Sequence, residues 1–521
     1  MKKFENLFDA YEPKYGLLFC LALAAFIKIL LLCLFQKPIN ADGTLYISIA
    51  KHFADGRFSD GMALYPMPFY PALIALVHFI IPNWDLAARL LSIFFMTFAI
   101  VPLYFLTRDL FNRHAAFWSA FAFAVSPVFN EWSVDVIRGT GFVFCVLWAV
   151  WLGQKALKLE KPAFFVWTGA ISVISFLFRV EGIFLIVFFP LFCIVRMLQK
   201  PKTAVSMAKG LMLWLAFIAV LGGAGLTAAH LNQMPVNRLD SVTSKADAAL
   251  QLEFMDKYME RYKALEKLEG TPPFYHGRQN LLETTRHFMY LVYLTGFGKI
   301  FIKVIFPCFF VALFFSSWRP MQVQHAFILG LIGFYLLLVY LNLINRDFMQ
   351  HRFVFAPACL VYPWVGQGLN NLFNRVKNSF RPNFWLFCFL AVFLVVPASK
   401  AFHSVVKRDD SVIIEAGRFA KQNELLRDAR VLTNDSQLPY YGGLTVDQFE
   451  TIPNKYEDDY AGMGKIAIKK QIDIIYIKVS DEKDIMPQFS GYRLIKKFPS
   501  DDRIIYIFGS AQFCKDKGLL Q

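Results

Sequence analysis

One carboxylate in the first part of the chain stands where it could act as a base. Asp42 lies in the segment NADGTLYISIAKHFADG, residues 40–56, a few residues after a long apolar run ends. Apolar residues then repeat at helical spacing, and Gly56 is suited to end that helix. A carboxylate fixed at the membrane surface can accept the proton of an attacking hydroxyl group. An Asp at a helix start also caps free backbone amides, so both roles stay open.

Other charged residues stand at the ends of other apolar runs. Residues 126–142 read SPVFNEWSVDVIRGTGF, FRVEGIF forms a tight turn, and HRFVFAP precedes a late apolar run. Arginine in such places can bind phosphate with paired hydrogen bonds, whereas local ion pairs, interfacial anchoring and snorkelling are the structural alternatives. The candidate donor-binding or acceptor-binding residues are Tyr46, Asp135, Arg138, Arg179, Glu181, His351 and Arg352.

The composition decides what kind of protein must position these residues. Of 521 residues, 56% are hydrophobic, 17% are aromatic and only 18% are charged. Soluble domains contain roughly 25% charged and 45–50% apolar residues. This excludes a disordered, collagen-like or disulfide-rich secreted protein and argues against a soluble enzyme. The class that remains is an α-helical polytopic membrane protein.

Apolar runs long enough to cross a membrane predict about eleven spans. Basic residues follow the second, fourth, sixth and tenth of these in short loops, which predicts a cytoplasmic N-terminus and an external C-terminus. The net charge of +15 is concentrated in those loops, so a nucleic-acid partner is not expected. The predicted spans are 15–35, 86–106, 115–130, 140–154, 163–178, 182–198, 210–229, 300–317, 323–343, 353–370 and 383–398.

Two domains are expected. Residues 1–399 form the membrane domain, with outer loops 36–85 and 230–299, and residues 400–521 form an extracytoplasmic α/β domain. The predicted elements of this tail are a helix over 410–423 and strands over 429–432, 472–479 and 503–508.

The predicted topology brings Asp42 and the other charged segments to the outer face of the membrane. A site there with carboxylates and arginines suits a donor carrying a lipid-linked phosphate and a polar acceptor. No CxxC occurs among the eight cysteines, and no ligand spacing indicates a metal site. A divalent cation shared by Asp42 and a second carboxylate, Asp135 or Glu181, is left open.

Several motifs resemble the GT-C superfamily of integral-membrane glycosyltransferases, in the bacterial branch related to protein O-mannosyltransferases and lipid A aminoarabinose transferases. They run through most of the membrane part and continue in the tail. They are Asp42-x-x-x-Tyr46 with Ala50 and Gly56, FYPALIAL, ARLLS, YFLTRDLFNRHAA, SPVFNE, FRVEG, HRFVFAPACLVYPWVGQGL, VLTND and PYYGG.

This resemblance implies an inverting transfer from a polyprenyl-phosphate sugar to a lipid, glycan or protein acceptor. It implies a bacterial inner-membrane enzyme with an extracytoplasmic catalytic face. Asp42 would be the general base, and Arg352, with Arg179 or Arg138, would neutralise the departing phosphate. The chain departs from the aminoarabinose branch at Tyr65-Pro66-Met67-Pro68, where that branch has an acidic-lysine pair, which argues against aminoarabinose as the sugar.

Two other functions are compatible with a membrane protein of this composition. A transporter or flippase of lipid-linked sugars would have ionisable groups near the middle of its spans and two repeated halves. Here charges gather at helix ends, with Lys28 as an exception, and no repeat is visible. A non-catalytic scaffold that docks partners on its tail would tolerate the loss of Asp42.

Overall fold

The computed structural model describes residues 2–34, 37–231, 253–269, 289–317, 322–346, 349–406, 411–452, 459–480, 487–500 and 503–518. The chain divides into two compact units. The first comprises Met1–Ile29, Ser92–Ser133 and Arg138–Ala401, and the second comprises Leu30–Leu91, Val134–Ile137 and Phe402–Gln521. The whole of the predicted outer loop 36–85 therefore belongs to the same unit as the tail. A division into domains 1–399 and 400–521 stays a prediction.

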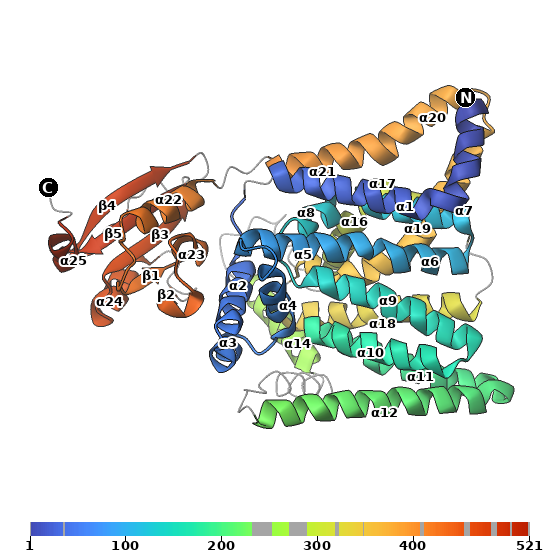
Figure 1. Ribbon diagram of the computed structural model, residues 1–521, viewed down its shortest axis with the longest axis horizontal. Helices are drawn as coiled ribbons and strands as arrows, with labels where there is room; N and C mark the ends of the chain where they lie inside the picture. The colour runs from blue at the N-terminus through green and yellow to red at the C-terminus, as the bar shows by residue number, and fades with distance from the viewer. Residues whose placement is uncertain are drawn as a thin grey trace. The chain divides into compact units, whose positions relative to one another are not determined.

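The first unit is a bundle of long helices lying side by side, with α9 against α10, α7 against α19 and α10 against α12 (Figure 1). The helices wholly or mainly in it are α1 (Lys2–Leu34), α6 (Ile100–Leu110), α7 (Arg113–Val125), α8 (Pro127–Ser133), α9 (Gly139–Leu159), α10 (Pro162–Phe178), η1 (Val180–Gly182), α11 (Ile183–Gln199), α12 (Pro201–Leu231), α14 (Glu253–Glu269), α16 (Met289–Ile305), α17 (Pro307–Ala312), η2 (Leu313–Phe315), α18 (Val323–Arg346), η3 (His351–Phe353), α19 (Phe355–Lys377), α20 (Pro382–Leu390), η4 (Ala391–Val395) and α21 (Val396–Val406).

Seven helices of the described part of the chain are long and apolar enough to cross a membrane. They are Tyr15–Leu34, Trp84–Leu110, Gly139–Leu159, Val180–Gln199, Pro201–Gly223, Val323–Arg346 and Pro382–His403. The helices at the other predicted spans are shorter or less apolar, such as α10 with its 17 residues. The protein is thus mainly helical, as predicted, while the number of eleven spans and the orientation stay predictions.

Two predicted spans are broken by proline. The predicted span 300–317 is not one straight helix, because α16 and the following Pro307–Phe315 bend by 94°. The predicted span 115–130 is interrupted at Ser126, whose backbone is extended before Pro127. A proline lacks the amide hydrogen of a helix interior and disfavours helical backbone in the preceding residue. Of the predicted loop 230–299, residues 232–252 and 270–288 lie outside the described residues.

The second unit contains three helices of the first predicted outer loop: α2 (Ala41–Ala54), α3 (Phe58–Leu64) and α4 (Phe69–His78). It also contains the first residues of α5 (Trp84–Phe98). Gly56 follows α2 with a φ of 76°, as expected for the residue after a helix end. α4 begins at Phe69, and Pro71 is tolerated in its first turn, where no amide hydrogen is needed.

The tail folds into a five-stranded mixed sheet with the order β2-β1-β3-β5-β4. β1 is parallel to β2 and β3, whereas β5 is antiparallel to β3 and β4. Its elements are α22 (Ser411–Gln422), β1 (Val431–Thr433), α23 (Gln437–Tyr441), η5 (Val446–Gln448), β2 (Phe449–Thr451), α24 (Tyr460–Lys469), β3 (Ile474–Ser480), β4 (Tyr492–Pro499), β5 (Arg503–Ser510) and α25 (Ala511–Asp516). The predicted helix and all three predicted strands are confirmed.

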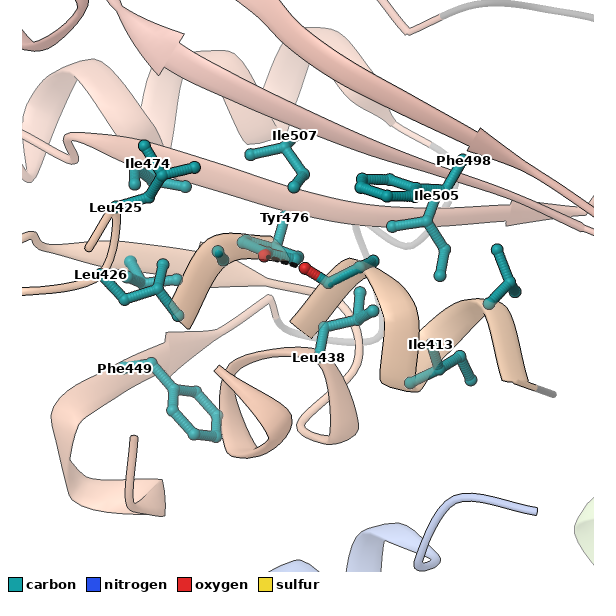
Figure 2. Packing of buried hydrophobic residues seen from close by; sticks show 14 of the residues in the cluster. Ile413, Leu425, Leu426, Leu438, Phe449, Ile474, Tyr476, Phe498, Ile505 and Ile507 are labelled. Atoms are coloured by element: carbon teal, nitrogen blue, oxygen red, sulfur yellow. Dashed lines mark hydrogen bonds between the residues drawn. The ribbon is translucent and has the colours of Figure 1, made fainter. Parts of the chain in front are cut away.

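Alternate residues of β3 pack into two different hydrophobic cores, one on each face of the sheet. Ile474 and Tyr476 pack with α22 and α23 on one face, while Ile475 and Ile477 pack with α24 on the other. Figure 2 shows the first core, in which the Tyr476 hydroxyl donates to the carbonyl of Ala416 at 3.0 Å. A strand buried on both faces needs a nearly continuous apolar run, which explains the sequence IDIIYIKV.

One close helix contact gives a test of the packing in the first unit. Gly366 of α19 has no room for a Cβ atom, which would lie 2.5 Å from the Cβ of Ser119 in α7. A Cβ atom added to Gly333 of α18 would have no neighbouring atom within 4 Å. We expect Gly366→Ala to lower the unfolding temperature of the solubilised protein by several degrees, since the two helices must separate. Gly333→Ala should leave it unchanged or raise it slightly, and equal effects of both variants would contradict this packing.

Candidate active site

Asp42 lies in the first turn of α2 with an exposed side chain. The residue that caps α2 is Asn40, so the sequence-based alternative that Asp42 is the cap is wrong. The Asn40 side-chain oxygen accepts a hydrogen bond from the amide of Gly43 at 2.7 Å. Its side-chain nitrogen donates to the carbonyl of Val136 at 3.2 Å. Because Asn40 satisfies the helix amide, the carboxylate of Asp42 is not required for that purpose.

The backbone around Asp42 is tightly enclosed on its inner side. Gly43 lies against the side chains of Ile39 and Val136, and a Cβ atom there would come within 2.9 Å of the Val136 Cβ. Ile39 is itself fully buried. Only glycine fits at this position, so the first turn of α2 packs at a fixed, short distance from Ile39 and Val136. Asp42 therefore stands on a turn with little freedom to move.

Two other candidate residues share a unit with Asp42. The ring of Tyr46 is buried and meets Tyr70 edge-on, with centroids 5.5 Å apart. The Asp135 carboxylate accepts a hydrogen bond from the amide of Val136 at 2.8 Å. Residues 134–138 are not helical, so Asp135 and Arg138 do not share a helix face, as the structural alternative of a local helical ion pair would require. Arg89 holds this segment by donating to the carbonyls of Val134 at 3.2 Å and Lys37 at 2.8 Å.

The first unit brings three other candidates together. Arg179 and Glu181, at the turn between α10 and α11, form an ion pair in which the Arg179 Nε lies 3.3 Å from a Glu181 oxygen; Arg179 is buried and Glu181 is half-buried. The Arg179 guanidinium also lies over the ring of Phe142, 5.8 Å from its centroid. Arg138 is near enough to interact with Glu181 electrostatically, and the buried Tyr335 is near both partners. The sequence contained no signal for Tyr335, since it lies within an apolar helix.

His351 and Arg352 lie in η3, directly before α19. Burial and the positive charge of Lys303 in α16 both lower the pKa of the His351 imidazole. His351 is therefore mainly neutral at neutral pH and can offer one nitrogen as an acceptor. Lys303 is a second residue near this segment that the sequence did not single out.

The predicted site residues thus fall into two sets. Asp42, Tyr46 and Asp135 belong to the second unit, and Arg138, Arg179, Glu181, His351 and Arg352 belong to the first. Within the part of the chain that the structure describes, no group of three or more His, Cys, Asp or Glu side chains could hold a metal ion. A divalent cation at Asp42 stays a prediction, and the chemistry proposed below uses protein groups.

Comparison with known families gives a match over part of the chain. Residues 65–222 match the family described as dolichyl-phosphate-mannose-protein mannosyltransferase. No curated protein matches the chain significantly.

Solved structures match over most of the chain. The oligosaccharyltransferase of Archaeoglobus fulgidus in its apo form has a TM-score of 0.55 and 14% identity, covering 90% of this chain and 70% of that one. The archaeal oligosaccharyltransferase AglB from the same organism, in complex with an inhibitory peptide and a dolichol-phosphate, has a TM-score of 0.54 and 13% identity, covering 89% of this chain and 69% of that one. ArnT from Cupriavidus metallidurans bound to undecaprenyl phosphate gives 0.51 and 11%, covering 95% and 98%. This chain has the fold of the GT-C membrane glycosyltransferases, the superfamily that its sequence motifs resemble.

Proposed function

We propose that this protein is a glycosyltransferase that moves a sugar from a polyprenyl-phosphate carrier to a lipid, glycan or protein acceptor. The observation that carries the proposal is an exposed carboxylate, Asp42, on a rigid helix start within a GT-C fold. The family matched over residues 65–222 is named for dolichyl-phosphate-mannose, and ArnT was solved with undecaprenyl phosphate. Both molecules contain a polyprenyl phosphate, which supports this class of donor. We place the reaction at the extracytoplasmic face of a bacterial inner membrane, following the predicted topology.

The proposed reaction is a single displacement with inversion. The acceptor oxygen forms a bond to the anomeric carbon while the bond from that carbon to the phosphate oxygen breaks. The acceptor proton passes to the Asp42 carboxylate. Polyprenyl phosphate leaves with one additional negative charge, which cationic side chains must stabilise as it develops.

The arginines are the proposed binding groups for that phosphate. Arg352 and Arg138 would contact it directly. Arg179 is already engaged by Glu181 and buried, so its charge is partly balanced and its position is fixed. We propose that this ion pair completes the donor site by orientation, with Tyr46, Asp135 and His351 as the remaining contacts of donor or acceptor.

The transporter alternative receives no support from the one ionisable residue deep in a predicted span. Lys28 is fully buried, and its ammonium donates to the side-chain oxygen of Asn130 at 3.0 Å. Asn130 donates in turn to the carbonyl of Ala124. These enclosed hydrogen bonds join helices α1 and α8, so they give Lys28 a structural role in the packing of the two helices.

Asp42→Asn tests the proposed base. Membranes containing the full chain and its natural acceptors are supplied with radiolabelled polyprenyl-phosphate mannose, and in parallel with other hexose and pentose donors. We expect Asp42→Asn to lower the transfer rate at least about 100-fold, because the amide cannot accept the proton. Asp60→Asn is the matched control, since Asp60 is also an exposed Asp in the first turn of a helix of the same loop. Equal rates for both variants would remove Asp42 from the mechanism.

Arg352→Gln tests the proposed phosphate site. Loss of a charge-assisted hydrogen bond to phosphate should raise the KM for the polyprenyl-phosphate donor by roughly 10-fold or more. Arg346→Gln, at the exposed end of α18, is the control for a general loss of positive charge near this segment. The assignment fails if Arg346→Gln and Arg352→Gln change the donor KM equally.

A further inference from the structure

A short segment of the tail runs along the helix that carries Asp42. The segment is Ser436–Gln448, which includes α23 and η5, and it lies in the same unit as α2. Thr44, Ser48 and His52 follow one another at intervals of four residues, so they form one stripe on α2. All three are buried, although they are polar. A buried polar stripe requires hydrogen-bond partners. The Thr44 and Ser48 hydroxyls donate to carbonyls of α2 itself, and the tail supplies further partners.

Each residue of this stripe contacts the tail segment. The Thr44 hydroxyl lies 3.2 Å from that of Ser436. The Ser48 hydroxyl accepts a hydrogen bond from the amide of Val446 at 3.2 Å. The Nε2 of His52 lies 3.2 Å from the Asp447 carboxylate. Although burial alone would raise the pKa of Asp447, hydrogen bonds from Thr445, from its own backbone amide and from His52 lower it. The tail therefore contacts α2 over two full turns and more.

A further contact of the tail lies three residues before Asp42. Two side chains of α23 bind both backbone groups of Ile39. The Ile39 amide donates to the Tyr441 hydroxyl at 2.9 Å, and its carbonyl accepts from the Gln437 side chain at 2.6 Å. Since Ile39 directly precedes the cap residue Asn40, these bonds fix where α2 begins.

The same part of α23 is anchored to the start of α5. Asp85 accepts a hydrogen bond from the Tyr440 hydroxyl at 2.5 Å and one from the Tyr441 hydroxyl at 3.5 Å. Burial, followed by the charge of Asp85, raises the pKa of both phenols, which keeps them protonated as donors. Lys51 of α2 also lies over the Tyr440 ring, 5.1 Å from its centroid. Tyr440 and Tyr441 thus share Asp85, but of these two phenolic hydroxyls it is that of Tyr441 that also accepts the hydrogen bond from the Ile39 amide.

We infer that the tail is a positioning element of the active site: Tyr441 and Gln437 hold the turn that carries Asp42 at the place where it can accept the acceptor proton. The inference rests on the proposed role of Asp42 and assigns these two residues no contact with substrate. It differs from a tail that merely selects the acceptor, because selection would act on the KM for the acceptor. Positioning acts on kcat, since a displacement of about 1 Å can cost roughly 100-fold in rate.

Tyr441→Phe and Tyr440→Phe form a matched pair for the test. Each removes one hydroxyl from neighbouring tyrosines that bind the same carboxylate, but only the first removes the acceptor of the Ile39 amide. In the full chain, kcat and KM are measured at varied concentrations of polyprenyl-phosphate mannose and of the native membrane extract that supplies the acceptor. The donor is replaced by whichever sugar proves active in the Asp42→Asn experiment.

We expect Tyr441→Phe to lower kcat by roughly 10-fold with both KM values within about 2-fold of the original protein. Tyr440→Phe should keep kcat within about 2-fold. Gln437→Glu, which keeps the length of the side chain but removes the donor to the Ile39 carbonyl, should act like Tyr441→Phe. Hydrogen–deuterium exchange gives a readout independent of activity: peptides that contain Ile39 should exchange faster in Tyr441→Phe than in Tyr440→Phe.

Three outcomes would overturn the inference. The first is a kcat for Tyr441→Phe and Gln437→Glu equal to that of Tyr440→Phe while Asp42→Asn is inactive, which leaves the proposed function intact. The second is an increase in the acceptor KM alone, which would assign the tail to acceptor selection. The third is full activity of Asp42→Asn, in which case the proposed base itself fails, whatever the tyrosine variants show.

Discussion

The backbone turn from Ile39 to Thr44 is the part of the second unit on which the proposed chemistry depends. Its conformation is fixed by short, directional contacts: two hydrogen bonds to Ile39, the cap at Asn40 and the close approach to Gly43. Each such hydrogen bond contributes only about 0.5–1.5 kcal/mol, so none of them alone accounts for the stability of the fold. Together these contacts determine the geometry of the turn: the Asp42 carboxylate is exposed, while Ile39, Gly43 and Thr44 are buried.

The charged side chains at the turn between α10 and α11 of the first unit form an ion pair. Arg179 and Glu181 are largely removed from water, where an isolated charge would be very costly. The pair satisfies each partner, and the ring of Phe142 provides a further face for the guanidinium. Such an ion pair stabilises the folded protein little more than apolar residues of similar size would. Replacing one partner, however, would leave the other as an uncompensated charge largely removed from water, which is strongly destabilising. In the proposed donor site, this arrangement would hold the Arg179 cation at a fixed position.

The parts of the fold that could be predicted are those governed by local patterns. β3 could be predicted because a strand buried on both faces requires an apolar run. α22 could be predicted because its apolar residues recur at helical spacing. β2 and β4 were not identified. β2 has only three residues, and β4 is an edge strand with exposed Arg493 and Lys496 and an irregular register after Leu494, so neither shows a clear alternation. The helices are interrupted at Ser126 and Phe306, each directly before a proline, although the predicted spans 115–130 and 300–317 continued through these positions.

The sequence by itself determined that this is a helical membrane protein with a small α/β tail, because hydrophobicity, periodicity and turn residues act over short stretches of chain. It also singled out Asp42, Arg179 and Glu181, since charged residues beside apolar runs are costly and few. Only the tertiary structure decided that Asn40 caps α2 and that Tyr441 and Gln437, about 400 positions later, bind Ile39. The stripe of Thr44, Ser48 and His52 was present in the sequence, but a polar residue does not specify its partner. That choice is made by packing between segments far apart in the chain, for which no local pattern exists.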